Sequence, residues 1–406
     1  MNLLLRRLRA DLFATPADGA LSLGLIALIS AAALGLVQWA GQKAEWAVIQ
    51  ANSTLFAVGR YPEAQQWRLW LLSALLTAAA GVSWGLLRCH PRSDRDGELW
   101  PRNDRLVLGL LAVVSLWLPW ALGLAPALQS RWWLLAALLG ASRWLAGRFG
   151  SRLSRPMLRL FPLVWPLLYL FGMVLISGGL GLMPVSPSQW GGLLLTLLTA
   201  SFAILLCFPL GVLLALGRRS DLPLLRWSAV IYIEFIRGAP LITLLFLGQN
   251  ILGFLLPGGL APDRIWRAAW VLTFFAAAYL AEAVRSGLAA VPKGQVEAAR
   301  SLGLSYPQTL VRVILPQALR VALPAMVGQF ISLLQDTTLL SLIGLLELLG
   351  VARTVMANPE FLGHNAEVYL TLALLFWSCC AALGLGSRAL EKRLDPQTLS
   401  RSTSRP

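Results

Sequence analysis

The sequence predicts an all-α membrane protein with about ten transmembrane helices, and three observations carry that prediction. Of the 406 residues, 57% are hydrophobic and only 13% are charged. The mean hydropathy is +0.68, and the core of one soluble domain could not bury so many apolar residues. Ten apolar runs approach or exceed the length that crosses a bilayer, about 20 residues. They lie at 20–40, 67–87, 106–125, 132–146, 160–182, 190–216, 227–256, 265–287, 321–345 and 366–385.

Two of these runs need separate interpretation. The run 132–146 is short and contains Arg143, so we expect it to tilt or to lie at the membrane interface. The run 20–40 follows a basic segment but lacks a convincing small-residue cleavage site. We therefore expect it to be retained as an anchor rather than removed as a signal peptide.

The net charge of +15 follows the predicted topology. If the N-terminus is cytoplasmic, the inner segments hold 25 of the 34 Lys and Arg residues and the outer segments hold seven. That asymmetry is the positive-inside rule, and it predicts a multi-pass plasma (inner) membrane protein with both termini in the cytoplasm. The basicity therefore indicates orientation, and no nucleic-acid partner is expected.

Several kinds of chemistry are excluded by the residues that are missing. There is no G-x-x-x-x-G-K-[ST] phosphate-binding motif, so the chain is not expected to hydrolyse ATP itself. There is no nucleophile elbow and no metal signature, so neither an enzyme nor a metal site is predicted. Cys89 beside His90 is more readily a chance pair, because no further ligands lie nearby at finger-like spacing.

The most informative segment is GQVEAARSLGLSYPQTLVRVILPQAL at 294–319, a polar stretch between two long apolar runs. Pro292 can open a short helix, and Gly303 can close it in the left-handed conformation. Ser305 with Gln308 forms a capping box that would start a second helix. The segment therefore predicts two short helices that meet at a fixed elbow and form a docking element for a soluble partner. The alternative interpretation is an ordinary amphipathic surface hairpin.

The spaced string of this segment resembles the cytoplasmic coupling loop of ABC importer permeases, a loop that sits in a groove of the ATPase subunit in that family. The residues that match this loop and would couple to the ATPase are Glu297, Ala298, Ala299, Gly303, Leu304 and Pro316, the last closing the string ILP that starts at Ile314.

Further blocks in the same order resemble the permease domain of importers for polar amino acids. They are EFIRGAPLITLLF at 234–246, AAYLAEAVRSGLAAVPKGQVEAARSLGLS at 277–305 and LPQALRVALPAMVGQFISLLQDTTLLSLIGLLELL at 315–349. Ala239 stands where a hydroxyl residue is usual, and Gln335 stands where Lys often precedes the Asp. The long N-terminal half is similar to that of general L-amino-acid permeases that work as heterodimers of two unequal chains.

The resemblance implies a domain organisation and a set of partners. An N-terminal extension of about five helices at 1–185 would precede a five-helix type I importer core at 186–390, with the coupling loop at 292–318 and a cytoplasmic tail at 391–406. The partners would be ABC ATPase subunits, a second related permease, an extracytoplasmic solute-binding protein, an amino acid substrate and the lipid bilayer. ATP and Mg would be used by the partner ATPase, with no cofactor bound by this chain.

Charged residues inside the predicted spans are expensive and therefore need a reason. Glu234 and Arg237 lie three residues apart on one helix face and can neutralise each other. Gly238 and Pro240 follow at once, so a break in the helix is expected there. A broken helix beside an ion pair is typical of transporter substrate sites. The alternative is a purely structural ion pair.

A second polar group lies on the run 321–345. Gln329, Ser332 and Asp336 follow helical spacing and make a polar stripe on an apolar helix. With Thr337 and Thr338, this stripe is expected to face the translocation pathway, and a structural hydrogen-bond seam is the alternative. Glu282 and Arg285 are also three residues apart, and structural pairing is their expected role.

Taken together, these features predict the permease subunit of an ATP-driven amino acid importer. The alternative is a secondary transporter driven by an ion gradient, which could use the same broken helix and buried charges. It offers no reason for a docking hairpin between two membrane helices. An intramembrane enzyme would need paired Asp residues or Ser and His within the bilayer, and both histidines lie in loops.

Overall fold

The computed structural model describes residues 15–88, 126–150, 160–255 and 262–394. Within these ranges every named element is a helix. Two isolated β-bridges also occur, Gly59 with Trp190 and Gly192 with Glu347. The N-terminal elements are α2 (Pro16–Gln42), α3 (Ala47–Ala51), α4 (Ser53–Val58), η1 (Glu63–Gln65), α5 (Trp67–Arg88), α7 (Pro126–Phe149), η3 (Phe161–Leu163), α9 (Val164–Ser177) and η4 (Pro187–Gln189).

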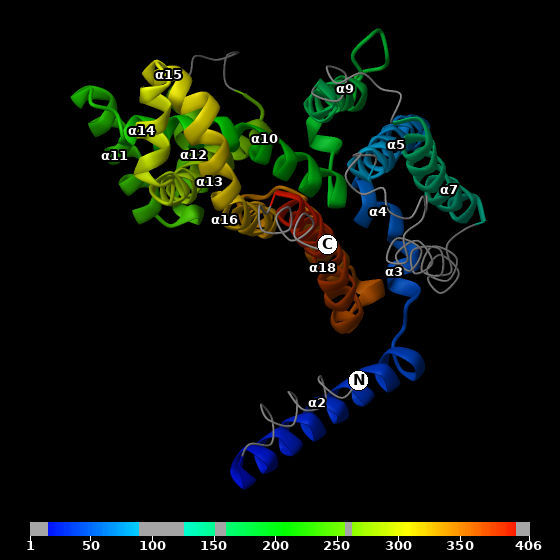
Figure 1. Ribbon diagram of the computed structural model, residues 1–406. Coiled ribbons are helices and arrows are strands. Elements are labelled where there is room, and N and C mark those ends of the chain that lie inside the picture. The colour runs from blue at the N-terminus through cyan, green and yellow to red at the C-terminus, as the bar shows by residue number, and fades with distance from the viewer. Residues whose placement is uncertain (1–14, 89–125, 151–159, 256–261, 395–406) are drawn as a thin grey trace.

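The remaining elements form the second half of the bundle. They are α10 (Gly192–Arg218), α11 (Pro223–Gly238), α12 (Leu241–Leu255), α13 (Arg264–Ala289), α14 (Lys293–Ser301), α15 (Tyr306–Thr309), η5 (Leu310–Ile314), α16 (Leu315–Asp336), η6 (Thr337–Ile343), α17 (Leu348–Met356), η7 (Pro359–Phe361) and α18 (Asn365–Leu394). Figure 1 shows α5, α7 and α9 on one side, α11 to α16 on the other, and α10 and α18 between them.

The fold class is confirmed, but the predicted number of membrane helices is too high for the described residues. Six helical segments are long and apolar enough to cross a membrane. They are Pro16–Gln42, Glu63–Leu86, Gly192–Arg218, Arg264–Ala289, Tyr306–Ile343 and Asn365–Arg388. The pair Pro223–Gly238 and Leu241–Ile251, bent by 108°, would make a seventh if counted as one span.

Three predicted runs account for the shortfall. The run 106–125 lies outside the described residues. The run 132–146 forms part of α7, which is not among the candidate spans and packs along α5, where the buried Arg143 lies 5.0 Å from the Trp84 ring centre. The run 160–182 yields the 14-residue α9, because Gly178 takes a left-handed conformation that closes the helix.

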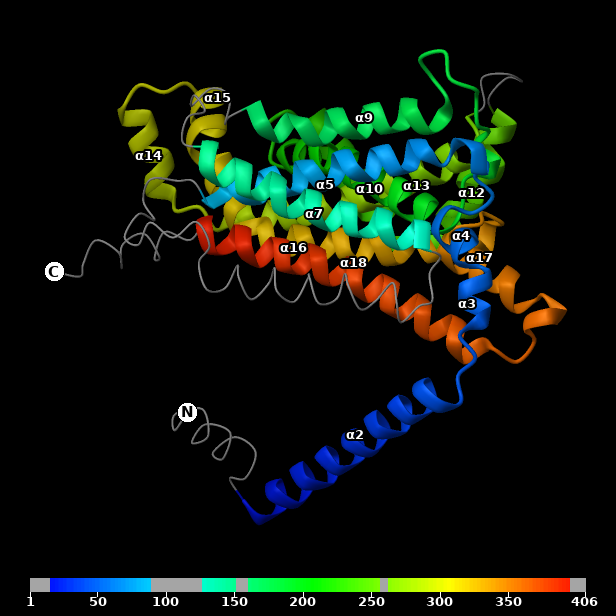
Figure 2. The same cartoon turned by 90° about the vertical axis from the view of Figure 1, so that its right-hand side faces the viewer.

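The helix α2 leaves the bundle and points away from it (Figure 2). It begins four residues before the predicted run 20–40, with Thr15 and Asp18 forming a capping box, and none of its residues is buried. After α2, the chain turns back, and the segment of α3 and α4 packs on α17 and α18. The buried side chains Val48, Ile49 and Phe56 meet Leu348 and Val351 there.

The core of the bundle is built from small residues on α13. Ala268, Ala276 and Ala277 of this helix are fully buried, and α10 and α16 pack against it. At Gly211 of α10, an added Cβ would lie 2.8 Å from Leu280. Because small side chains let helix backbones approach closely, these three helices form a tight inner layer.

The N-terminal half joins the core where α10 begins. Gly192 has a φ of +57°, and an added Cβ there would lie 2.3 Å from the Phe56 carbonyl oxygen. Its N–H donates to the Leu346 carbonyl at 2.9 Å. Gly59 and Gly191 touch through their backbones, since a Cβ on Gly59 would lie 2.4 Å from the Gly191 Cα. Only glycine fits this junction without a shift of the backbone.

A buried carboxylate lies beside this junction. Glu347 is fully buried and caps α17, accepting hydrogen bonds from the N–H groups of Leu349 at 2.8 Å and Gly350 at 2.9 Å. Burial raises the pKa of this carboxyl to about 7, while the two backbone donors partly oppose that rise. Glu347 lies outside the candidate membrane spans.

We expect Gly192→Ala to destabilise the protein by at least about 2 kcal/mol, because a Cβ strains the left-handed backbone and collides with the Phe56 carbonyl. Thermal unfolding of the purified chain in detergent measures the change. The control is Gly384→Ala on α18, where an added Cβ meets nothing within 4 Å. Equal melting temperatures for both variants would contradict this account of the junction.

We expect thermal stability to fall as the pH rises from about 5 to about 8, by about 2 kcal/mol. The raised pKa of Glu347 means that the folded chain holds this proton more tightly than the unfolded chain, so the contribution is lost as the pH rises through about 7. Glu347→Gln should flatten this dependence, whereas Glu360→Gln, at an exposed position, should keep it. A slope unchanged by Glu347→Gln would contradict the assignment.

Candidate functional site

The segment between α13 and α16 forms the predicted hairpin of two short helices. Pro292 precedes α14, and Gly303 follows it with a φ of +76°. At the start of α15, the Gln308 side chain accepts a hydrogen bond from the Ser305 N–H at 3.1 Å, which completes the capping box. The predicted helix boundaries and the elbow between them are confirmed.

The hairpin is bonded to α16, and at its base α13 and α16 pack closely on each other. The Gln317 side chain on α16 donates to the Gln295 side chain on α14 at 3.4 Å. Below the hairpin, Gly287 of α13 packs on α16 so closely that an added Cβ would lie 2.3 Å from the Ala318 carbonyl oxygen. A short π-helical turn, η5, joins α15 to α16. The hairpin therefore follows α13 in the chain and contacts α16 directly.

The outer surface of the hairpin is open. Figure 2 shows α14 and α15 protruding at one end of the bundle, with α12 and α17 at the other. Glu297 and Ala298 are exposed, whereas Ala299 is buried and anchors α14. Leu302 is 80% exposed and Tyr306 is 66% exposed. Apolar side chains this exposed on a polar hairpin are typical of a protein-binding surface.

The other predicted loop residues have structural places. Leu304 is half-buried, and its N–H donates to the Ala299 carbonyl at 3.1 Å across the elbow. Pro316 occupies the first turn of α16, where its missing N–H leaves no gap in the helix.

Five charged side chains gather between the hairpin and the middle of the bundle. The Glu282 carboxylate on α13 contacts Arg285 at 2.8 Å, Arg218 at 3.4 Å and Arg237 at 3.9 Å. Arg218, at the end of α10, also contacts Glu234 on α11 at 3.0 Å. Glu282 lies seven residues before the end of α13, or about 10 Å from it. We call these five residues, Arg218, Glu234, Arg237, Glu282 and Arg285, the charge cluster.

The cluster changes one expected pairing and keeps another. The predicted ion pair between Glu234 and Arg237 does not form, because each of them binds a partner on another helix. The reason is tertiary: Arg218 approaches from α10 and Glu282 from α13, and both offer closer opposite charges. Glu282 and Arg285 do form the local pair expected from their spacing.

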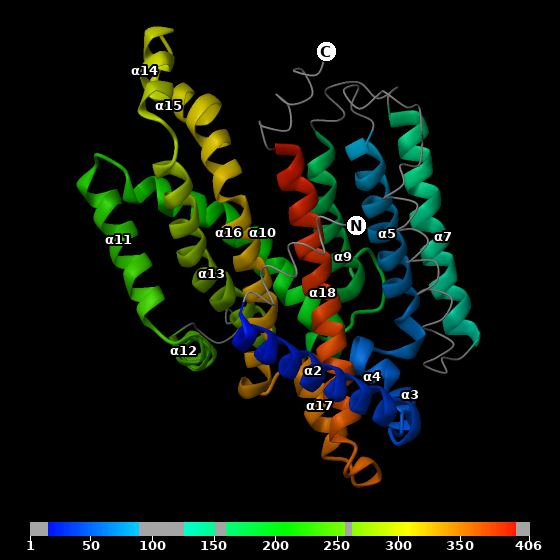
Figure 3. The ribbon, with the colours of Figure 1, turned by 60° about the horizontal axis from the view of Figure 1, so that its bottom comes forward.

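The break after Arg237 is present and sharp. The helix α11 ends at Gly238, α12 begins at Leu241 after Pro240, and the two helices are bent by 108°. Figure 3 shows α11 turning into α12 at the end of the bundle away from α14. The Arg237 guanidinium lies over the Tyr279 ring, 5.6 Å from its centre. The predicted single run 227–256 is therefore two helices with different directions.

The polar stripe on α16 is only partly open. Ser332 is exposed, while Gln329 and Asp336 are half-buried. Thr337 is buried and donates to the Leu334 carbonyl at 2.6 Å, and Thr338 donates to the Gln335 carbonyl at 2.8 Å. The hydrogen-bond acceptors of these two hydroxyls are therefore backbone carbonyls of the same helical segment. Among the described residues, the stripe forms no ion pair with the charge cluster and remains a separate group.

Sequence reasoning missed one member of the cluster. Arg218 ends an apolar run beside Arg219, so its sequence context indicates a flanking positive charge at a helix end. Its proximity to two acids on other helices depends on the packing of α10 against α11 and α13. One signal did exist, since the two acids Glu234 and Glu282 both needed basic partners inside the bundle. Among the described residues, no cluster of His, Cys, Asp and Glu could hold a metal ion.

Comparison with known proteins places this architecture beside membrane transport components. Residues 207–396 match the family described as "Binding-protein-dependent transport system inner membrane component". That stretch begins within α10 and includes the charge cluster, the hairpin and the polar stripe.

Three relatives extend the comparison. The chain is 44% identical over 237 residues to the inner membrane amino-acid ABC transporter permease protein YhdY of Escherichia coli, and the match covers 58% of this chain and 63% of that protein. It is 35% identical over 371 residues to the glutamate/glutamine/aspartate/asparagine transport system permease protein BztC of Rhodobacter capsulatus, covering 86% and 78%. It is 38% identical over 205 residues to the probable glutamine ABC transporter permease protein GlnP of Bacillus subtilis, covering 50% and 92%.

We expect Glu282→Gln to destabilise the protein by about 1–3 kcal/mol, because three guanidinium groups lose their shared counter-charge. The control is Arg285→Gln, which removes one partly exposed partner and should cost less, about 0–1 kcal/mol. Thermal unfolding of both variants in detergent measures the difference. An Arg285→Gln variant as unstable as Glu282→Gln would contradict a central role for the carboxylate.

Proposed function

The chain belongs to the family of binding-protein-dependent transport system inner membrane components, and on that premise we propose that it is the permease subunit of an ATP-driven amino acid importer in the plasma (inner) membrane. The relatives that match it carry names of amino acid permeases, and one of them names glutamate, glutamine, aspartate and asparagine. The chain is a transport subunit and not an enzyme. The observation that carries the proposal is the open hairpin between α13 and α16.

The hairpin defines how the permease sits in the membrane. The distribution of Lys and Arg supports a cytoplasmic location for the hairpin and both termini. The opposite end of the bundle, with α12, α17 and the junction at Gly192, then faces outward. This orientation puts the exposed Leu302 and Tyr306 where a cytoplasmic protein can reach them.

Glu297, Ala298 and the exposed residues of the elbow form the contact surface for a separate ABC ATPase. The ATPase binds ATP with Mg, and this chain binds neither. Movement of the ATPase pushes α14, and the close contact of Gly287 with α16 carries the movement into α13 and α16. The buried Ala299 and the left-handed Gly303 keep the hairpin stiff, so that the push is not absorbed by bending.

The charge cluster and the break at Gly238 and Pro240 give the membrane helices two states. Arg237 is shared between the Glu282 carboxylate and the Tyr279 ring, and Arg218 is shared between two acids. Exchange among these partners lets α11 move relative to α13 without leaving a charge unpaired. Gln329, Ser332 and Asp336 of α16 and Thr337 and Thr338 of η6 then border the translocation pathway, and the Glu282–Arg285 pair braces α13.

The complete importer contains partners beyond this chain. We assign it two ATPase subunits, a second related permease and an extracytoplasmic solute-binding protein that delivers the amino acid. A transporter driven by an ion gradient is the competing function, and the exposed hairpin favours the ATP-driven importer because a gradient-driven protein has no motor to dock there.

We expect Glu297→Lys to reduce ATP-driven uptake of L-glutamine by about tenfold or more, because a reversed charge at the docking surface opposes binding of the ATPase. Uptake into right-side-out vesicles that contain the whole complex provides the measurement. The amount of permease in the membrane should not change. Asp221→Lys is the matched control, an equal charge reversal at an exposed residue outside the hairpin.

Two outcomes would refute the proposal. Normal ATP-driven uptake by the Glu297→Lys complex would remove the docking role of the hairpin. Uptake by the unchanged protein in vesicles that have an ion gradient but neither ATP nor ATPase subunits would instead identify a secondary transporter.

A further inference from the structure

A cavity lies at the end of the bundle away from the hairpin, between α12, the first turn of α13 and the end of η6. Its volume is about 380 Å³. Ligand pockets for small molecules measure roughly 300 to 1,000 Å³, so this cavity has the size for one small metabolite. Its lining residues are Phe246, Gln249, Asn250, Arg264, Arg267, Leu342 and Ile343.

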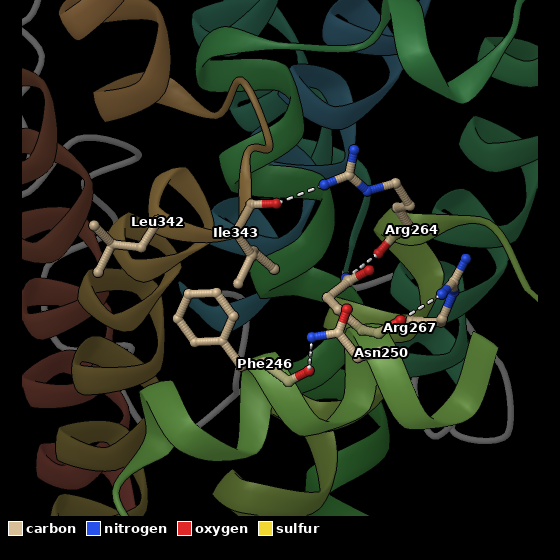
Figure 4. A pocket seen from close by; sticks show the side chains of 7 residues that line it. Phe246, Asn250, Arg264, Arg267, Leu342 and Ile343 are labelled. Carbon is tan, nitrogen blue, oxygen red and sulfur yellow. Dashed lines mark hydrogen bonds between the residues drawn. The ribbon is translucent and has the colours of Figure 1, made fainter. Parts of the chain in front are cut away.

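Two guanidinium groups line the cavity, and the structure fixes both by backbone carbonyls. Arg264 donates to the Ile343 carbonyl at 2.7 Å. Arg267 donates through Nε to the Pro262 carbonyl at 2.8 Å and through Nη1 to the Gln249 carbonyl. Each guanidinium keeps further N–H donors beyond these bonds. Figure 4 shows Arg264 and Arg267 on the same side of the cavity, opposite Phe246 and Leu342.

These arginines lack a protein counter-charge within the described part of the chain. No carboxylate there forms an ion pair with Arg264 or Arg267. The nearest acid in sequence, Asp263, instead caps α13 by accepting from the Ile265 N–H at 3.0 Å. Two cations that are held in place by carbonyls and share a cavity create a site that favours an anion, and the fork of a guanidinium suits a carboxylate.

Gln249 adds a second and independent feature to the same cavity. This residue is only 9% exposed, and its Nε2 donates to the Arg264 carbonyl at 2.6 Å. That bond leaves Oε1 as a buried acceptor with no donor among the described residues. A buried acceptor without a partner is costly unless a ligand or water supplies a donor. Beside it, Asn250 donates through Nδ2 to the Phe246 carbonyl, which leaves its own oxygen to accept.

The combination selects a ligand with both kinds of group. A simple anion would neutralise the arginines but would leave the Gln249 oxygen without a donor, and a cation would do the reverse. We propose that this cavity is an outer binding site for a free L-amino acid, with the carboxylate on Arg264 and Arg267 and the ammonium group on the Gln249 oxygen. The exposed Phe246 and Leu342 then cover the side chain, whose identity the site does not restrict strongly.

This inference rests on the proposed function, because an importer of amino acids must receive its substrate at the outer end of the bundle. The site is separated from the charge cluster by most of the length of α13. Arg264 in the cavity and Arg285 in the cluster lie 21 residues apart on this helix, or about 30 Å. It therefore holds the substrate before translocation and is distinct from the groups on α11 and α16.

The first experiment measures occupancy directly. Leu342→Cys is introduced into the full chain with its four native cysteines replaced, and a membrane-impermeant maleimide is added to right-side-out vesicles that contain the complex. L-Glutamine at about ten times its dissociation constant should slow labelling about tenfold. L-Glutaminamide lacks the carboxylate and N-acetyl-L-glutamine lacks the ammonium group, and neither should protect. Arg264→Gln with Arg267→Gln should remove protection, whereas Arg353→Gln, an exposed arginine on α17, should retain it.

The second experiment leaves every hydrogen bond of the cavity in place. Leu342→Asp adds a fixed carboxylate beside the arginines and should reduce ATP-driven L-glutamine uptake by about tenfold, because it occupies the cations and repels the substrate carboxylate. Leu342→Asn is the uncharged reference of equal size, and uptake by the Asp variant should be about tenfold below uptake by the Asn variant.

The outcomes separate this inference from the proposed function. Equal protection by L-glutamine, L-glutaminamide and acetate, or equal uptake by the Asp and Asn variants, would overturn the outer site while the importer assignment stands. A complex that takes up no amino acid with ATP would refute the importer, and the labelling experiment, which needs no ATP, would still decide whether the cavity binds an amino acid.

Discussion

The Glu282 carboxylate is the interaction on which the arrangement of the central helices depends. It contacts guanidinium groups from three helices, Arg218 on α10, Arg237 on α11 and Arg285 on its own helix α13. Charged groups at this depth of a helical bundle are tolerated only when they are paired, so the three arginines must stay close to this carboxylate. As a result, Glu282 ties α10, α11 and α13 together between the hairpin and the middle of the bundle.

The hairpin and the broken helix differ in stiffness for reasons that lie in single residues. At the base of the hairpin, Gly287 and Ala318 bring the backbones of α13 and α16 into contact, and Gln295 and Gln317 add a side-chain bond. At the break, Gly238 and Pro240 leave a 108° bend between two separate helices. Movement imposed on the stiff hairpin is therefore expected to be absorbed at the break.

Features set by neighbours in sequence could be predicted, and features set by packing could not. The capping box at Ser305, the left-handed Gly303 and the break at Pro240 follow from local backbone chemistry, and the structure has all three. The partner of Glu234 could not be predicted, because Arg218 reaches it from another helix. Helix number was overestimated because hydropathy does not separate a spanning run from α9, which a glycine cuts short.

The same limit applies to the end of the bundle away from the hairpin. The glycine junction at Gly192 and the cavity at Arg264 are formed by residues that are far apart in the chain. No local pattern in these apolar stretches indicates either feature. The predicted division of the chain at 185 and the pathway role of Asp336 remain predictions. The spaced string around Glu297 could be recognised because its residues lie on one short segment, and its coupling role remains a prediction.

The most direct test of this account measures from which side of the membrane the hairpin is accessible, and whether the ATPase subunits shield it. Ala298→Cys, at an exposed position of α14, would be labelled with a membrane-impermeant maleimide in right-side-out and inverted vesicles, with and without the ATPase subunits. The account predicts labelling only in inverted vesicles and its suppression by the ATPase. Labelling from the outside of intact cells, or labelling that the ATPase does not change, would contradict it.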